Sequence, residues 1–411
     1  MKAETDAIRT DKSDATVPWD SRTVQVVLVS TALAPLGVPL ISPALPVFRD
    51  TFGISDAQAS LLVSSYFLVG IVLSPFIGVL VDRLGRKRVL VGGLISFGVI
   101  GGGMAVAPTF EALLALRIVQ GSAAAAIFIT TVTLVGDEFD GVQRNAVLGV
   151  NVAVLSATAA LFPVVGGALA TVAWNAPFLT YLAAIPVALF ALVTLEEPQH
   201  DRTSRGTAYL TDATRAIATV PTLALFGVAF LTEFLLFGVL FTALPFLLAA
   251  ALAPVVIGLV ILASEAASMI VAAANGKLAR TTSNERLIAG GFACYAVGFA
   301  AIWLSSGLLS VVAAVTIVGV GVGLLMPAVD AAVSDLVPTD QLAGAMSLRN
   351  STTFLGRTAG PFAFTGLAIP AGYGYETLLL GAGIVALIAT GVAALPQTRR
   401  LVQTVLVPES A

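Results

Sequence analysis

The feature that most constrains this chain is a series of twelve apolar runs separated by short polar, glycine-rich or proline-containing segments. A helix of about 20 apolar residues crosses the hydrocarbon core of a bilayer. Only 11% of the residues are charged, whereas soluble domains carry about 25%. The sequence therefore predicts an all-α integral membrane protein with twelve transmembrane helices, at 24–48, 57–81, 89–107, 111–135, 146–170, 173–195, 223–248, 254–279, 287–304, 308–334, 342–369 and 374–396.

Lysine and arginine concentrate on one side of this topology. If both termini are cytoplasmic, the inner segments carry 17 of the 21 cations, the outer loops carry only Arg49, and Arg117, Arg349 and Arg357 lie within helices. Cytoplasmic loops of membrane proteins are enriched in Lys and Arg. We therefore expect a multi-pass protein of the plasma (cytoplasmic) membrane with both termini in the cytoplasm.

The first apolar run contains four prolines, at positions 35, 39, 43 and 46. Proline removes a backbone donor and interrupts a helix. Lipid-buried helices tolerate it where neighbouring helices satisfy the freed backbone groups. We expect this helix to be bent and to lie inside the bundle.

Composition excludes several classes of function. The net charge of -3 and the pI of about 5.3 leave no basic surface for nucleic acid. The chain lacks the Gly-x-x-x-x-Gly-Lys-Ser/Thr segment that binds ATP phosphates. His200 is the only histidine and Cys294 the only cysteine. We therefore expect no metal site, no organic cofactor and no intrachain disulfide.

The chain repeats itself with an offset of 198 residues. "GVLVDRLGRKRVLVGG" at 78–93 aligns with "GKLARTTSNERLIAGG" at 276–291, and the same offset pairs Gly121 with Gly319, Asp137 with Asp335 and Pro163 with Pro361. An even number of helices per repeat gives both repeats one orientation in the membrane. We expect two parallel six-helix halves at 23–195 and 223–396, a linker at 196–222, and cytoplasmic tails at 1–22 and 397–411.

Charge concentrates in the first copy of the repeated segment. There, Gly78, Asp82, Arg83, Gly85, Arg86 and Lys87 match the pattern Gly-x-x-x-Asp-Arg-x-Gly-Arg-Arg/Lys, the first motif of the major facilitator superfamily. With its two parallel halves, nearly the whole chain resembles this family. The segments "SYFLVGIVLSPFIG" and "LRIVQGSAAA" resemble its twelve-helix drug:proton antiporter branch more than the sugar porters.

Two interpretations of the charged motif remain open. A loop that only fixes topology explains the cations, but it explains neither the leading Asp82 nor Gly85, which suits a tight turn. The resemblance implies that Asp82 and Arg86 hold the cytoplasmic side closed in the outward-open state. Candidate partners are Asp137, Glu138 and the start of the helix at 342–369. The second copy has Arg280 and Asn284 at the positions of Asp82 and Arg86, so the halves are not equivalent here.

Charged side chains inside the helices are the main candidates for transport chemistry, because each costs about 2.5–3.5 kcal/mol at the bilayer centre on insertion scales. Glu233 and Glu265 lie near the midpoints of their helices, where secondary transporters bind substrates and coupling ions. A carboxyl group shielded from water there can hold a proton near neutral pH. The alternative is a structural ion pair of either acid with Arg357. Asp330 is a possible gate or merely interfacial.

Two further segments match family patterns. Arg117, followed by Gln120 and Gly121, matches Arg-x-x-x-Gly, so the resemblance implies that Arg117 assists proton movement or faces the cavity. The alternative is an arginine that extends to the membrane surface. Pro163, Gly166 and Gly167 resemble the antiporter motif Gly-Pro-x-x-Gly-Gly, with Phe162 in place of its first glycine. Packing and an exchange-specific role are equally supported there.

The sequence predicts a transporter that is not an enzyme. We expect proton-coupled alternating access, most simply antiport, that exports small amphipathic organic compounds, with the proton as coupling ion. The expected partners are substrate, protons and lipid, and the expected state is a monomer. A symporter or uniporter of a polar metabolite is the nearest alternative, although the mostly apolar helices favour apolar cargo. A membrane sensor of the same fold that does not transport is another, and a polytopic enzyme is disfavoured because no catalytic constellation is apparent.

Overall fold

The structure is a computed structural model that describes residues 16–197, 219–338 and 342–395. These residues contain helices and connecting turns but no strand. Most of both predicted tails and of the linker, together with His200, lies outside the described residues.

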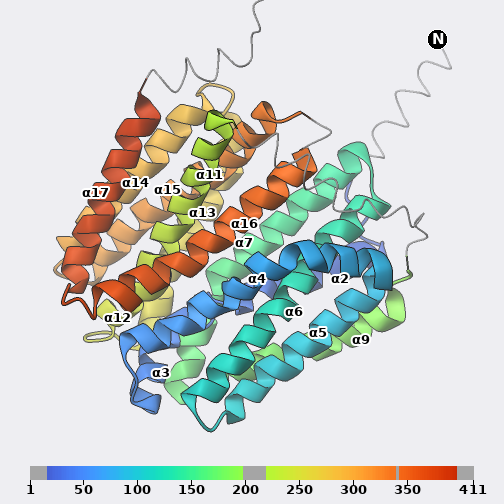
Figure 1. Ribbon diagram of the computed structural model, residues 1–411, viewed down its shortest axis with the longest axis horizontal. Helices are drawn as coiled ribbons and strands as arrows, with labels where there is room; N and C mark the ends of the chain where they lie inside the picture. Colours follow the sequence, from blue (N-terminus) through green and yellow to red (C-terminus); the bar gives the residue numbers. More distant parts are fainter. Residues whose placement is uncertain (1–15, 198–218, 339–341, 396–411) are drawn as a thin grey trace, which may run out of the picture.

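The first repeat forms a bundle in which the apolar runs become helices (Figure 1). Its helices are α2 (Arg22–Ala32), the short 3-10 turns η1 (Ala34–Leu36) and η2 (Ser42–Ala44), α3 (Leu45–Phe52), α4 (Asp56–Leu84), α5 (Arg86–Gly103), η3 (Met104–Val106), α6 (Phe110–Glu138), α7 (Gly141–Val172), α8 (Ala176–Leu179), η4 (Thr180–Ala183) and α9 (Ala184–Thr194).

The second repeat forms a similar bundle with two wide turns of π-helix. Its helices are α11 (Val220–Leu235), the π-helix η5 (Leu236–Ala243), α12 (Leu244–Leu248), α13 (Pro254–Leu278), α14 (Asn284–Trp303), α15 (Leu308–Leu336), α16 (Leu342–Pro361), the π-helix η6 (Phe362–Ala368) and α17 (Tyr375–Ala394).

The prediction of a helical membrane protein is confirmed. By length and hydropathy, however, fewer than twelve helices of the described residues qualify as membrane spans. Nine helices in the described residues qualify as spans, and ten if the bent pair Asp56–Ile71 and Phe76–Leu84 is one span. The first run falls short because its prolines break it into α2, η1, η2 and α3, leaving Arg22–Leu36 as a shorter apolar helix. The other missing span is α16, whose sequence includes two arginines and several hydroxyl side chains.

The expected bend in the first run is confirmed, and the broken region lies inside the bundle. Leu36, Leu40 and Ile41 are almost fully buried. The hydroxyl of Ser42 donates to the backbone oxygen of Phe241 at 2.6 Å, which links the break to the second repeat.

The repeat register appears in the helix bounds. The starts of α5 and α14, at Arg86 and Asn284, are 198 positions apart, and so are the starts of α6 and α15, at Phe110 and Leu308. Helices in equivalent places therefore begin at equivalent residues, as expected for two parallel halves.

The two repeats meet most closely where α7 crosses α13 and where α4 crosses α16. A Cβ atom on Gly167 would lie 2.3 Å from the backbone oxygen of Pro254, and one on Gly258 would lie 2.2 Å from that of Pro163. Small residues allow such close backbone approach between membrane helices. Both contacts lie toward the end of the bundle that carries α3 and α12, which we call the Arg49 end; the opposite end is called the Arg86 end.

Candidate transport and gating sites

Glu233 and Arg357 form an ion pair between α11 and α16. Arg357 donates from Nε to Glu233 Oε2 at 2.9 Å and from Nη2 to Oε1 at 3.1 Å, so both carboxylate oxygens are engaged. The Glu233 side chain is 2% exposed and that of Arg357 is 26% exposed. Such a two-point pair is strong, and removing one partner leaves a buried charge without compensation.

Phenylalanine rings surround the Arg357 guanidinium. Its central carbon lies 5.1 Å from the ring centre of Phe237, 5.4 Å from that of Phe67 and 5.8 Å from that of Phe354. Arginine is attracted to aromatic faces at such distances. Phe67 belongs to α4 of the first repeat, so the ion pair lies where the two repeats meet.

Glu265 lies on α13 and interacts electrostatically with both Glu233 and Arg357. The described residues give its carboxyl group no hydrogen-bond or ion-pair partner, and its side chain is only partly buried. The structure therefore brings the two predicted carboxyl groups and Arg357 into one cluster. Arg357 pairs with Glu233, and Glu265 remains the acid without a direct partner in the described chain.

Asp330 also interacts with the charge of Glu233, but its direct partner is Arg349. Its Oδ1 lies 2.7 Å from Nη2 of Arg349, which joins α15 to α16 within the second repeat. The Arg349 side chain is 6% exposed and the Asp330 side chain 42% exposed. This pair fixes two neighbouring helices of one half to each other.

Arg117 is fully buried, so the alternative of an arginine extending to the membrane surface is wrong. Its guanidinium donates to the backbone oxygen of Leu62 at 2.9 Å, to Gln120 Oε1 at 2.7 Å and to the Tyr181 hydroxyl at 3.0 Å. It also donates to the backbone oxygen of Gly37. Fixed in this way, Arg117 stabilises the broken first helix against α4, α6 and η4.

Pro163, Gly166 and Gly167 lie on one face of α7. A Cβ atom on Gly166 would overlap the backbone oxygen of Leu40, at 1.7 Å, and Gly167 faces Pro254 as described above. The motif therefore packs α7 against the break in the first helix on one side and against the second repeat on the other. Its part in exchange remains a prediction.

The charged motif forms an ion-pair cluster at the Arg86 end. Nη2 of Arg86 lies 3.0 Å from Asp82 Oδ1, and its Nε lies 2.8 Å from Asp137 Oδ2. The Arg86 side chain is 10% exposed, whereas Arg83 is exposed and Lys87 is partly exposed. Asp137, one of the expected partners, thus contacts Arg86, while Glu138 accepts a hydrogen bond from Ser21. All these contacts are within the first repeat.

The structure requires a glycine at position 85 but not at position 78. A Cβ atom on Gly78 would contact nothing within 4 Å. Gly85 has φ of 96°, a conformation that L side chains rarely adopt, and a Cβ atom there would lie 2.5 Å from Glu197 Oε1.

Glu197 is a member of this cluster that the sequence analysis missed. Its Oε1 accepts a hydrogen bond from the backbone N–H of Arg86, the first residue of α5, at 2.5 Å. A carboxylate at a helix N-terminus satisfies an unpaired donor and interacts favourably with the helix dipole. The only available signal was a glutamate just after the last apolar run of the first repeat, which has no distinctive pattern.

Replacing Asp82 with Asn should leave the protein in the membrane and abolish most transport. The change removes one of the two carboxylates paired with Arg86 and keeps side-chain size. Transport in membrane vesicles, normalised to protein content, measures the effect. Asp140→Asn is the control, because Asp140 is an exposed acid outside the motif that makes no side-chain cap hydrogen bond. Wild-type rates in the Asp82 variant would show that the motif only fixes topology.

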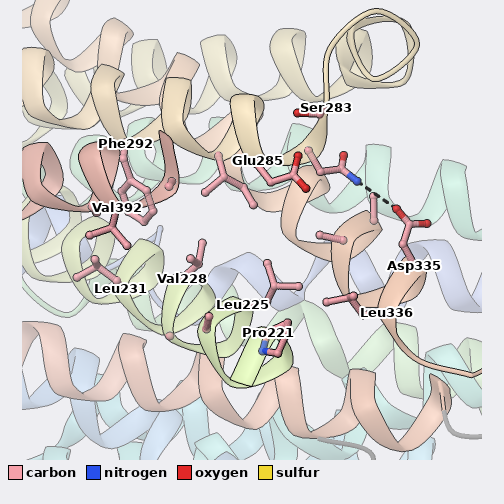
Figure 2. Close-up of a pocket in the computed structure, with 18 of the residues that line it drawn as sticks. Pro221, Leu225, Val228, Leu231, Ser283, Glu285, Phe292, Asp335, Leu336 and Val392 are labelled. Carbon is pink, nitrogen blue, oxygen red and sulfur yellow. Dashed lines mark hydrogen bonds between the residues drawn. The ribbon is translucent and has the colours of Figure 1, made fainter. Parts of the chain in front are cut away.

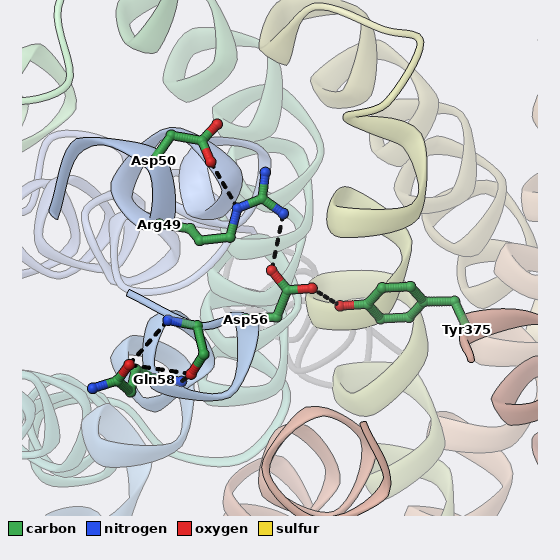
Figure 3. A network of polar contacts seen from close by, with 6 residues as sticks. Arg49, Asp50, Asp56, Gln58 and Tyr375 are labelled. Atoms are coloured by element: carbon green, nitrogen blue, oxygen red, sulfur yellow. Dashed lines mark hydrogen bonds and ion pairs between the residues drawn. The ribbon is translucent and has the colours of Figure 1, made fainter. Parts of the chain in front are cut away.

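A second polar network, also missed by the sequence analysis, joins the repeats at the Arg49 end (Figure 3). Arg49 binds Asp50 Oδ1 from Nε at 2.8 Å and Asp56 Oδ1 from Nη1 at 2.9 Å. The other oxygen of Asp56 accepts a hydrogen bond from the hydroxyl of Tyr375, at the start of α17. Arg49 also lies over the ring of Phe246, 5.8 Å from its centre.

Arg49 stays positively charged in this network. The carboxylate of Asp50, followed by that of Asp56, keeps the pKa of the Arg49 guanidinium above its ordinary value. The Arg49 side chain is 31% exposed and Asp56 is 17% exposed. The network holds the two repeats together at this end, so it must break whenever they separate there.

Replacing Tyr375 with Phe should weaken closure at the Arg49 end about five- to tenfold. The change removes only the hydroxyl that binds Asp56, and a hydrogen bond to a charged group contributes about 1.5–3 kcal/mol, part of which solvent recovers at this partly exposed site. Reaction of a charged maleimide with a cysteine at Ala44, which is fully buried where η2 meets the second repeat, measures opening. Tyr373→Phe is the matched control, because Tyr373 is exposed two residues away. Equal labelling in both variants would contradict the prediction.

The fold and these sites define a class of protein. The chain is a helical membrane protein with repeat-related halves, a buried charge pair where the halves meet, and separate ion-pair networks at its two ends. This architecture is that of a membrane transporter built from two repeats.

Comparison with known proteins identifies the family. The model of the Major Facilitator Superfamily matches residues 27–361, with a second match at 226–406. The chain belongs to the major facilitator superfamily. It is therefore a multi-pass membrane transporter and not an enzyme.

Two relatives of known name are similar in sequence. Quinolone resistance protein NorA of Staphylococcus aureus is 30% identical over 171 residues, which is 41% of this chain and 44% of that relative, so the match spans less than half of its length. The bacillibactin exporter of Bacillus subtilis (strain 168) is 25% identical over 349 residues, 81% of this chain and 86% of the exporter.

Solved structures share the fold. A bacterial homologue of the human lysosomal transporter Spinster, in an inward-facing and unoccupied conformation, has a TM-score of 0.72 and 16% identity over 95% of this chain and 98% of that one. A mutant of the nucleoside transporter NupG has a TM-score of 0.75 and 12% identity over 91% of this chain and 100% of that one.

Proposed function

We propose that this protein exports small amphipathic organic compounds across the plasma membrane in exchange for protons. The observation that carries the proposal is the Glu233–Arg357 pair, which is buried, lies between the repeats and is surrounded by phenylalanine rings. It offers a carboxylate that can exchange a proton and an apolar surface that can hold cargo.

The proposed exchange follows from competition between Arg357 and a proton for the Glu233 carboxylate. When Glu233 is ionised, both of its oxygens are bound by Arg357, which joins α11 to α16. A proton on Glu233 removes one charge of the pair, and the low dielectric of the site then makes the remaining Arg357 charge costly. Protonation thus favours a rearrangement of these two helices. Glu265, which senses both charges, is the second proton acceptor in this proposal.

The proposed cycle alternates closure between the two ends. In this structure the Arg49–Asp56–Tyr375 network and the α7–α13 contact close the Arg49 end. We assign this end to the outside and the Arg86 end to the cytoplasm, in accordance with the distribution of lysine and arginine. Breaking the Arg49 network, with closure of the Arg86 end through the charged motif, completes the cycle.

The cargo class is inferred from the site and the relatives. Phe67, Phe237 and Phe354 bind flat apolar molecules through stacking and burial. One relative is named for quinolone resistance and the other for export of bacillibactin. The second name describes export of an organic compound, which favours export over uptake of a polar metabolite or a sensor without transport.

The test uses everted membrane vesicles with an acidic interior and a fluorescent quinolone outside. Vesicles with the protein should accumulate the quinolone, and collapsing the pH gradient with nigericin should stop accumulation. Accumulation that persists without the gradient would support uniport. No accumulation of quinolone or bacillibactin under any gradient would overturn the proposed export of these compounds.

A further inference from the structure

A cavity lies inside the second repeat at the Arg86 end, between α11, α14, α15 and α17 (Figure 2). Its volume is about 1080 Å³, close to the upper range of about 300–1,000 Å³ for small-molecule sites. The cavity is separate from the Glu233–Arg357 pair: Leu231 lines it, and a separation of two residues places Glu233 on about the opposite side of the helix.

The cavity has an apolar end and an acidic end. Figure 2 shows Leu231, Phe292 and Val392 at one end, and Glu285 and Asp335 toward the other. The remaining walls are largely apolar, from residues such as Leu225 and Ile288. Such a lining suits a ligand with an apolar body and one charged group.

None of the residues that line the cavity is a lysine or an arginine. Among the described residues, neither Glu285 nor Asp335 forms an ion pair, and Asp335 Oδ2 accepts only a 3.3 Å hydrogen bond from the Asn284 amide. The C-terminal end of α15, which carries Asp335, adds negative potential, and the N-terminal end of α14 offsets it.

Comparison with the first repeat shows which charged group the second repeat lacks. At the positions equivalent to Asn284 and Asp335, Arg86 and Asp137 form an ion pair of 2.8 Å. In the second repeat an amide replaces the guanidinium, and Glu285 replaces the cationic Lys87. At these two positions the cations are lost while the carboxylate of Asp335 is retained, whereas Arg286 keeps the charge of Arg88 and Arg280 replaces Asp82. The place next to Asp335 is therefore open to an external cation.

We propose that this cavity binds a monovalent organic cation with an apolar body, whose charged group lies against Asp335 and Glu285 as the Arg86 guanidinium lies against Asp137. The site is distinct from the transport site proposed above and does not depend on it.

The test is a local protection measurement on the full-length protein in lipid nanodiscs. Ala332→Cys places a thiol in the cavity wall, in a chain that also carries Cys294→Ala, and alkylation by N-ethylmaleimide is timed. Tetraphenylphosphonium should slow alkylation, and its anionic isostere tetraphenylborate should not. The double change Glu285→Gln and Asp335→Asn should raise the half-protecting concentration of the cation about tenfold or more, since it removes both counter-charges.

Two further variants keep the result decisive. Val392→Cys is a second reporter if Ala332→Cys reacts poorly, and Asn284→Arg should abolish protection by supplying the missing cation within the chain. Glu233→Gln should leave protection intact even where it stops transport, which separates this inference from the proposed function. Equal protection by the anion, or full protection in the variant lacking both carboxylates, would overturn the inference.

Discussion

Replacing Glu233 with Gln is expected to reduce export driven by a pH gradient about 100-fold or more while the protein remains folded in the membrane. Gln keeps the size of the side chain but cannot exchange a proton, and it leaves Arg357 without its counter-charge. Removing one partner of a buried pair also costs about 3–5 kcal/mol of stability, so the amount of folded protein in the membrane is measured alongside transport. Initial rates of quinolone accumulation in everted vesicles measure the loss.

Matched variants separate coupling from general damage. Glu111→Gln removes an exposed acid and should leave export unchanged. Glu265→Gln leaves the Glu233–Arg357 pair intact, so it should reduce the rate of export less than Glu233→Gln. Export by Glu233→Gln that still follows the pH gradient would rule Glu233 out as the coupling group.

Replacing Gly167 with Val is expected to keep the Arg49 end open and to reduce transport at least about tenfold. The first added carbon would already lie 2.3 Å from the backbone oxygen of Pro254, and backbone has little freedom to move away. The α7–α13 contact between the repeats then no longer closes. Spin labels at the exposed positions Val172 and Ala251 report the separation of the two helices at this end by pulsed electron resonance.

Gly149→Val is the matched control for this prediction. Gly149 lies on the same helix, and a Cβ atom there would contact nothing within 4 Å. The label distance should increase in Gly167→Val and stay unchanged in Gly149→Val. Equal distances and equal transport in both variants would mean that this crossing does not control access.

Much of the fold was predictable because lipid imposes simple rules on a sequence. Apolar runs of sufficient length had to become helices, and the four prolines had to break the first one, which is why Arg22–Leu36 is too short to span alone. The repeat offset aligned Arg86 with Asn284, and in the structure α5 and α14 begin at these two residues, three positions before the predicted starts at 89 and 287. The number of spans was less predictable, because α16 carries polar side chains and does not qualify as a span by hydropathy. Its place in the bundle depends on its packing against neighbouring helices.

The candidate site was predictable in its residues and less so in its partners. Sequence position alone indicated Glu233, Glu265 and Arg357 as intramembrane charges, but it left open which acid pairs with Arg357. The Arg49–Asp56–Tyr375 network joins residues more than 300 positions apart, without any local pattern. Arg117 was also ambiguous, because burial and hydrogen bonding depend on how the first helix breaks.

The central claim is that cargo and protons move in exchange through the Glu233–Arg357 site. Proteoliposomes that contain the purified protein and an internal pH-sensitive dye test it directly. Adding cargo to one side without an imposed gradient should move protons in the opposite direction to the cargo in the wild type, and not in Glu233→Gln. Cargo that moves without any change in internal pH would contradict the account.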